Sequence, residues 1–99
     1  MAKFHLTNKA IEDLSAIWNY TYDTWNENQA DKYYALLINS CQNLAKTPFV
    51  GKKYDEISLN LRGYKAGKHI IFYQSITKDE VLIIRVLHET MDLKQRIKE

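Results

Sequence analysis

LRGYKAGKHIIFYQS, residues 61–75, decides the fold of this sequence. Gly67-Lys68, near its centre, predicts a two-residue loop with a type II′ turn, because a leading glycine readily adopts a positive φ. Such a loop sets the pairing of the flanking strands. The expected pairs are Ala66 with His69, Tyr64 with Ile71 and Arg62 with Tyr73. The segment therefore predicts an antiparallel β-hairpin.

The following residues extend this hairpin into a three-stranded meander. Thr77–Glu80 can turn the chain, and Val81–His88 is rich in the β-branched residues that favour strands. Ile70–Tyr73 and Val81–Ile84 are apolar at every position, which is typical of a sheet covered on both faces. Helices can cover one face, and either the C-terminal segment Met91–Glu99 or a partner chain must cover the other. This apolar surplus suggests a protein–protein interface.

The residues before Pro48 predict a short strand and two helices. Phe4 and Leu6 alternate with polar neighbours, as in a strand, and Thr7 or Asn8 can cap the helix that follows. Two apolar stripes at helical spacing then predict an antiparallel helical hairpin. They comprise Ile11, Leu14, Ile17 or Trp18, Tyr22 and Trp25, then Ala30, Tyr33, Leu37, Cys41 and Leu44. The predicted fold class is α+β: a strand, a helical hairpin, then a three-stranded antiparallel meander.

The ends of these helices follow from single residues. Asn26 tolerates the left-handed conformation that ends many helices, so the first helix is expected to end there. Pro48 cannot donate a backbone hydrogen bond and restrains Thr47, which ends the second helix. The aromatic residues of the first stripe are interpreted as core and hairpin packing.

Length and composition describe one small domain, residues 1–99. Hydrophobic residues make up 45% and charged residues 26% of the chain, which is ordinary globular composition. The longest apolar run, Tyr33–Ile38, has six residues, whereas a membrane span needs about 20. The single Cys41 and three scattered histidines suggest neither a disulfide nor a metal site. We expect a cytoplasmic protein without cofactor, metal or membrane contact, and a net charge of +2 does not predict direct nucleic-acid binding.

Arg62, Tyr64 and Tyr73 fall on one face of the predicted hairpin. A guanidinium group stacks on aromatic rings and binds carboxylates in a fork, so these residues are candidates for a recognition surface. The same residues could simply form cross-strand pairs that stabilise the sheet. Pattern alone favours neither interpretation.

Arg85 and His88 are two further candidates, both in the last strand. Arg85 is expected on the face opposite Leu82, Ile84 and Val86, where a buried charge needs a carboxylate, a phosphate or water. Either a partner contact or an internal ion pair with an acid on a helix or in the tail would satisfy it. His88 titrates near neutrality, but no nucleophile accompanies it, and no catalytic residues are predicted.

Taken in order along nearly the whole chain, the residues resemble the ParE toxins of bacterial type II toxin–antitoxin systems, within the RelE/ParE superfamily. The matching segments are Leu6-Thr7, Ala10, Asp13-Leu14, Ile17-Trp18, Trp25, Gln29-Ala30, Tyr33, Leu44-Ala45, Pro48, Gly51, Leu61-Arg62, Gly67-Lys68-His69, Ile71-Phe72-Tyr73, Arg85-Val86-Leu87-His88 and Met91-Asp92. The family fold has the strand–helix–helix–three-strand order derived above.

This resemblance implies a small toxin that a ParD-type antitoxin neutralises by lying along its helical hairpin and sheet. It also implies DNA gyrase as the target, inhibited by binding rather than by catalysis, and a role in plasmid stabilisation. Arg62, Tyr64, Tyr73 and Arg85 are then candidates for the antitoxin- or target-binding surface, with His88 at its edge. The alternative is RelE-type cleavage of mRNA on the ribosome, for which Arg62, Lys65, Arg85 and His88 are the plausible residues. A module that binds an antitoxin without being toxic is a third hypothesis.

Overall fold

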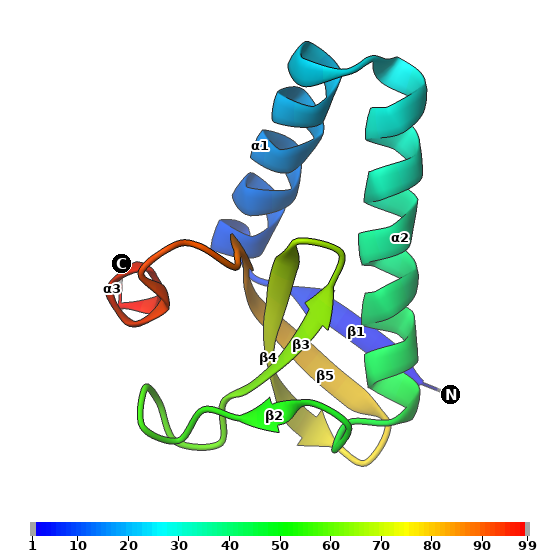
Figure 1. Ribbon diagram of the computed structural model, residues 1–99. Coiled ribbons are helices and arrows are strands. Elements are labelled where there is room, and N and C mark those ends of the chain that lie inside the picture. Colours follow the sequence, from blue (N-terminus) through cyan, green and yellow to red (C-terminus); the bar gives the residue numbers. More distant parts are fainter. Residues whose placement is uncertain (1, 99) are drawn as a thin grey trace.

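The elements of residues 2–98, the part of the chain that the computed structural model describes, follow the predicted order with two additions (Figure 1). They are β1 (Lys3–Leu6), α1 (Asn8–Thr24), α2 (Glu27–Lys46), β2 (Lys52–Lys53), β3 (Arg62–Ala66), β4 (His69–Thr77), β5 (Glu80–His88) and α3 (Leu93–Ile97). The α+β prediction is confirmed. Strand β2 and helix α3 escaped it because two and five residues are too short to show a period. No helix in this range is long and apolar enough for a membrane crossing.

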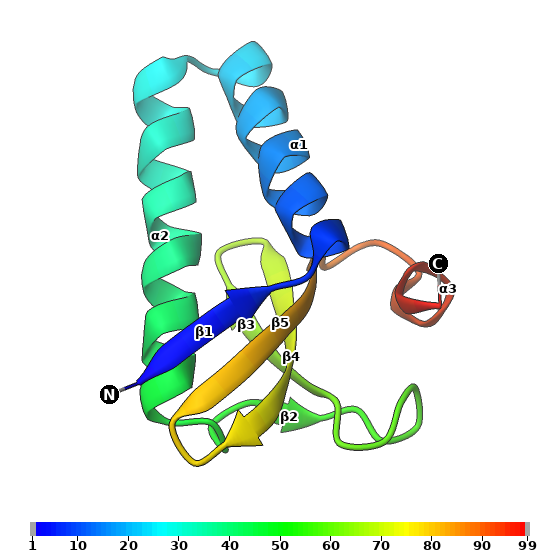
Figure 2. The same ribbon diagram turned by 180° about the vertical axis from the view of Figure 1, so that it is seen from behind.

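The strands form one sheet in the order β1-β5-β4-β3-β2, seen from both sides in Figures 1 and 2. The pairing of β3 with β4 agrees with the prediction, including Arg62 opposite Tyr73. Gly67 has a φ of 61°, as a type II′ turn requires. Strand β1 lies at the sheet edge and runs parallel to β5, so the first strand of the chain pairs with the last one.

Local capping residues set the bounds of the helical hairpin. The Thr7 hydroxyl accepts a hydrogen bond from the Ala10 amide at 3.0 Å, which begins α1. The sequence predicted that Asn26 would end α1 in the left-handed conformation, and this prediction is wrong. The backbone of Asn26 is extended, with a φ of −172°, and its side chain caps α2 by accepting from the Gln29 amide at 2.9 Å. Asparagine is both a good N-cap and a residue that tolerates the left-handed conformation. At Asn26 the capping of α2 decides the backbone conformation.

The hairpin covers one face of the sheet (Figure 2), and the larger core lies between them. Helix α1 contributes Ala10 and Leu14, and α2 contributes Leu37, Cys41, Leu44 and Ala45. The sheet contributes Ala66, Ile71, Tyr73, Val81, Ile83 and Val86. The predicted stripe of α2 is therefore buried as expected. On α1, however, burial is confined to the half of the helix that lies over the sheet.

The opposite face of the sheet carries a second, smaller core. Leu61, Phe72 and Leu87 are buried there. Tyr54 and Ile57 from the segment between β2 and β3, and Leu93 and Ile97 from α3, are among the side chains that pack against them. The sequence predicted that either the C-terminal segment or a partner chain would cover this face, and the C-terminal segment covers it. The segment between β2 and β3 also covers it, which was not predicted. The chain itself buries the apolar surplus of the sheet, so that surplus is not evidence for a partner.

A β-bulge shifts the faces of β5. Phe72 pairs with Arg85 but Tyr73 pairs with Ile83, which leaves Ile84 as an extra residue on β5. Val86 consequently faces the larger core, whereas Ile84 packs against the smaller one. The expectation that Ile84 and Val86 share a face opposite Arg85 is wrong, because strict alternation fails at a bulge.

Candidate functional site

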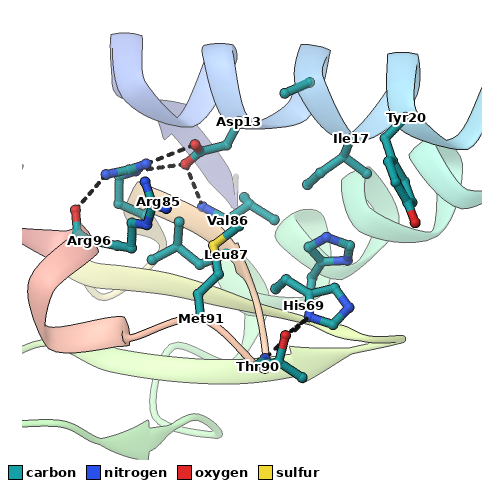
Figure 3. A pocket seen from close by; sticks show the side chains of 12 residues that line it. Asp13, Ile17, Tyr20, His69, Arg85, Val86, Leu87, Thr90, Met91 and Arg96 are labelled. Atoms are coloured by element: carbon teal, nitrogen blue, oxygen red, sulfur yellow. Dashed lines mark hydrogen bonds and ion pairs between the residues drawn. The ribbon is translucent and has the colours of Figure 1, made fainter.

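A pocket of about 500 Å³ opens between α1, the end of β5 and the C-terminal segment (Figure 3). Its wall is largely apolar and comprises Ala16, Ile17 and Tyr20 of α1, Val86 and Leu87 of β5, and Met91. The polar and charged residues that line it are Asp13, His69, Arg85, His88, Thr90 and Arg96. Two of the five predicted site residues, Arg85 and His88, therefore lie in one pocket.

Arg85 is held by an ion pair at the floor of this site. Its Nε and Nη2 donate to the two carboxylate oxygens of Asp13 on α1, at 2.7 and 2.9 Å, and its Nη1 donates to the carbonyl of Arg96 at 2.7 Å. The same carboxylate accepts from the Val86 amide at 3.0 Å. Arg85 is only 9% exposed. Of the two interpretations, the structure thus contains the internal ion pair with a helical acid, and this pair ties α1 to β5 and α3.

Two histidines line the other side of the pocket. His69 and His88 are opposite each other on β4 and β5, and their rings meet edge to face with centroids 5.2 Å apart. The Thr90 amide donates to His88 Nδ1 at 3.2 Å, and the Thr90 hydroxyl lies 2.8 Å from the same nitrogen. The ring orientation of His88 is therefore set by its own C-terminal neighbours.

His69 is built to stay neutral. The Tyr33 hydroxyl accepts from the Lys68 amide at 3.0 Å and forms a hydrogen bond with His69 Nδ1. Burial lowers the pKa of His69 to about 4, with a further contribution from neighbouring His88. A group with such a pKa carries no charge at neutral pH. His69 therefore contributes a neutral ring to the pocket.

Arg62 and Tyr64 lie outside this pocket. Arg62 donates to the carbonyls of Phe49 and Gly51, at 3.3 and 2.9 Å, and its guanidinium group is 5.3 Å from the Phe49 ring centroid. It lines a smaller hollow of about 310 Å³ near the loop after α2. Tyr64 is 36% exposed on β3. The predicted stacking of the arginine occurs, but on a phenylalanine of this chain.

Tyr73 is not a surface residue, contrary to the expectation from the sequence. It is fully buried, and its hydroxyl donates to the Pro48 carbonyl at 2.8 Å and accepts from the Gly51 amide at 2.9 Å. Burial raises the pKa of this hydroxyl. Its face of the sheet is the one that α1 and α2 cover, so Tyr73 anchors the loop that follows α2 and cannot contact a partner.

The pocket combines a paired charge with an apolar wall. Arg85 is neutralised by Asp13, and within residues 2–98 no group of three or more His, Cys, Asp or Glu side chains is arranged to hold a metal ion. An apolar wall with a few oriented polar groups is typical of a site for a peptide or another apolar ligand.

Asp13, Tyr20, His69 and Met91 belong to the pocket, although the sequence did not identify them as site residues. Only Asp13 left a detectable signal. It occupies a position in the buried stripe of α1, between Ala10 and Ile17, where a carboxylate implies a cation nearby. Tyr20 of α1, His69 of β4 and Met91 of the C-terminal segment meet there through tertiary packing, which shows no sequence period.

Comparison with known proteins places this arrangement in a family. The model of the ParE toxin of the type II toxin–antitoxin system parDE matches residues 4–93. The chain is 32% identical over 96 residues to Toxin ParE1 of Mycobacterium tuberculosis (strain CDC 1551 / Oshkosh), covering 97% of this chain and 98% of that protein. It is 30% identical over 97 residues to Toxin ParE1 of Caulobacter vibrioides, covering 98% and 99% of the two chains. Toxin ParE of Escherichia coli is 31% identical, with 98% and 94% covered.

The fold has a solved counterpart. A chain of the chromosomal ParDE toxin–antitoxin system from P. aeruginosa superposes with a TM-score of 0.75, covering 89% of this chain and 96% of that one at 18% identity. The arrangement of helices and sheet described above is therefore shared with a protein of distant sequence. The sequence matches extend over nearly the full length of both partners, and by them this chain belongs to the ParE toxin family of type II toxin–antitoxin systems.

Proposed function

We propose that a ParD-type antitoxin neutralises this toxin by occupying the pocket between α1, β5 and α3, and that the released toxin inhibits DNA gyrase by binding it. The observation that carries the proposal is the Asp13–Arg85 ion pair at the pocket floor. With Arg85 paired to Asp13, the wall of the cavity is mostly apolar, which suits the side chains of a peptide better than a phosphate. Arg85 and His88 then form part of the pocket that receives the antitoxin, and Arg62 and Tyr64 extend the surface along the sheet.

The same observation weighs against RelE-type cleavage of RNA. Such cleavage needs a base, an acid and converging cations that stabilise the phosphate. Arg85 is paired with Asp13, and Lys65 Nζ lies 2.9 Å from the Glu89 carboxylate. Arg62 lies in the separate hollow beside Phe49. The four residues named for this chemistry therefore do not converge on one point, which supports inhibition by binding.

Ala16→Glu tests the antitoxin site. Ala16 is exposed on α1 and lines the pocket, so a glutamate there places a charge in the cavity without disturbing the core. We expect the affinity for the antitoxin encoded beside the toxin to fall at least tenfold in calorimetric titration. The matched control is Ser15→Glu, an exposed neighbour outside the pocket lining, which should bind normally. Equal affinities for both variants would place the antitoxin elsewhere.

A supercoiling assay tests the target. Purified toxin should block the supercoiling of relaxed plasmid by gyrase, and a stoichiometric amount of antitoxin should restore it. No inhibition at a molar excess of toxin would argue against gyrase. Primer extension on translated mRNA covers the nuclease alternative, because codon-specific cuts that disappear in His88→Ala would replace the proposal with RelE-type chemistry.

A further inference from the structure

The hairpin extends beyond the sheet, and its far end has no layer beneath it (Figures 1 and 2). Ile17 is the last residue of α1 among those that pack against the larger core. We define the tip as residues 18–31, the last turns of α1 and the first turn of α2. The tip thus begins just after the last α1 residue that packs against the larger core.

The tip exposes aromatic side chains that belong to neither core of the sheet. Trp25 is 72% exposed and Tyr22 is 48% exposed. An aromatic side chain buries about 150–250 Å² when it is fully covered. The isolated chain covers little of Trp25 and only about half of Tyr22. Their exposure makes them available to a second protein.

These rings are held on a rigid support. Trp18 stacks on Tyr22 with ring centroids 5.3 Å apart, and its indole Nε1 donates to Asp31 of α2 at 3.0 Å. The Trp25 amide donates to the Thr21 carbonyl at 2.9 Å. A surface that is ordered before binding loses little entropy when it docks.

The tip is acidic. From Ala10 to Asp31 the sequence contains five Asp and Glu residues and no Lys or Arg. Asp13 is taken up by Arg85, which leaves Asp23, Glu27 and Asp31 around the aromatic rings. Within the described residues no ion pair joins these three carboxylates to a cation. A guanidinium or ammonium group can stack on indole and phenol rings and bind carboxylates at the same time.

We infer that the tip is the target-docking surface of the toxin, and that it receives a segment of the target protein that presents Arg or Lys side chains. This inference rests on the proposed function, since it assigns to the tip the step that follows release of the antitoxin. The negative charge of the tip favours a cationic partner, and its exposed aromatic rings favour a partner whose cations can stack on them. Trp, Tyr and Arg are the residues that dominate the binding energy of protein interfaces.

Asp23→Lys tests the inference with little risk to the fold. Asp23 is exposed in the last turn of α1, where a cation interacts favourably with the helix dipole. The variant should inhibit gyrase supercoiling at least tenfold more weakly than the wild type and should no longer arrest growth when induced. Glu56→Lys carries the same change of charge on an exposed residue between β2 and β3, and it should behave as the wild type.

Trp25→Ala is the second variant, and antitoxin affinity is the second measurement. Both tip variants should bind the antitoxin within about twofold of the wild type, because the pocket is unchanged. Wild-type toxicity in both tip variants would overturn the inference, as would a tenfold loss of antitoxin affinity in both. If the wild type arrests growth without inhibiting gyrase, the proposed target is wrong, and loss of growth arrest in the tip variants still supports docking through the tip.

Discussion

The two halves of α1 share a helical apolar pattern but have different surroundings. In the base, residues 8–17, Ala10 and Leu14 are buried on the sheet and Asp13 is paired with Arg85. In the tip, Tyr22 and Trp25 are exposed to solvent near Asp23, Glu27 and Asp31, which form no ion pair within residues 2–98. The same spacing of apolar residues therefore stabilises the fold in one half and offers a surface in the other. An amphipathic stripe indicates burial only where another layer of the molecule lies beneath it.

The largest effect is expected at the base, from Asp13→Ala. This change removes the Asp13 carboxylate from the nearly buried guanidinium group of Arg85, and breaking a buried pair in this way costs about 3–5 kcal/mol. Urea denaturation should show a loss of this size in the free energy of unfolding. Replacing both residues, as Asp13→Leu with Arg85→Met, should recover much of it. A loss below about 1 kcal/mol in the single variant would show that the base depends on other contacts.

A smaller effect is expected from Tyr73→Phe, which keeps the ring in the core but removes its hydroxyl. The Pro48 carbonyl and the Gly51 amide would each lose a partner, and an unsatisfied buried group costs about 1–3 kcal/mol. Denaturation should register this loss, whereas antitoxin affinity should not change. Weaker antitoxin binding by a fully folded variant would return Tyr73 to the recognition surface.

Acid should lower the free energy of unfolding of the protein through His69 on β4. The pKa of His69 is lowered to about 4, so between about pH 6.5 and pH 4 the unfolded chain binds a proton that the folded chain excludes. The free energy of unfolding therefore falls as the pH drops through this window. We expect about 1–2 kcal/mol, less than the full shift implies because the ring is partly exposed. His88, Glu89, Asp13 and Tyr33 surround this ring.

His69→Gln provides the control, because glutamine does not titrate. Denaturation of the wild type and the variant at pH 7, 5.5 and 4.5 should give a difference in stability that shrinks with acid. A difference that stays constant over this range would mean that His69 titrates alike in the folded and unfolded chains. The carboxylates common to both proteins cancel in the comparison.

The smallest effect on stability is expected at the tip. Trp25→Ala removes a large aromatic side chain that is mostly exposed, so the free energy of unfolding should change by no more than about 0.5 kcal/mol. The loss of stability can be compared directly with that of Asp13→Ala, because Asp13 lies in the base of the hairpin and Trp25 in its tip. A loss above about 2 kcal/mol would show that Trp25 packs in solution and that the tip is part of the core.

The sequence predicted the fold well where local chemistry decides it. The Gly67-Lys68 turn gave the register of β3 with β4, and Thr7 and Pro48 marked helix ends. The bulge at Ile84 could not be predicted, because its cause is the pairing with β4 and not a local preference. Of the five site candidates, Arg85 and His88 share the pocket, Arg62 and Tyr64 lie apart, and Tyr73 is buried. Alternation gives the face of a sheet but not which layer covers that face.

The parallel pairing of β1 with β5 has a consequence for synthesis of the toxin. Residues 3–6 find their strand neighbour only in residues 80–83, and Asp13 meets its cation at position 85. A nascent or prematurely ended chain that lacks β5 has no partner for its first strand and no counter-charge for its first helix. Interrupted translation is therefore expected to release an incomplete polypeptide that degradation can remove, so that harm to the cell begins only with a finished molecule.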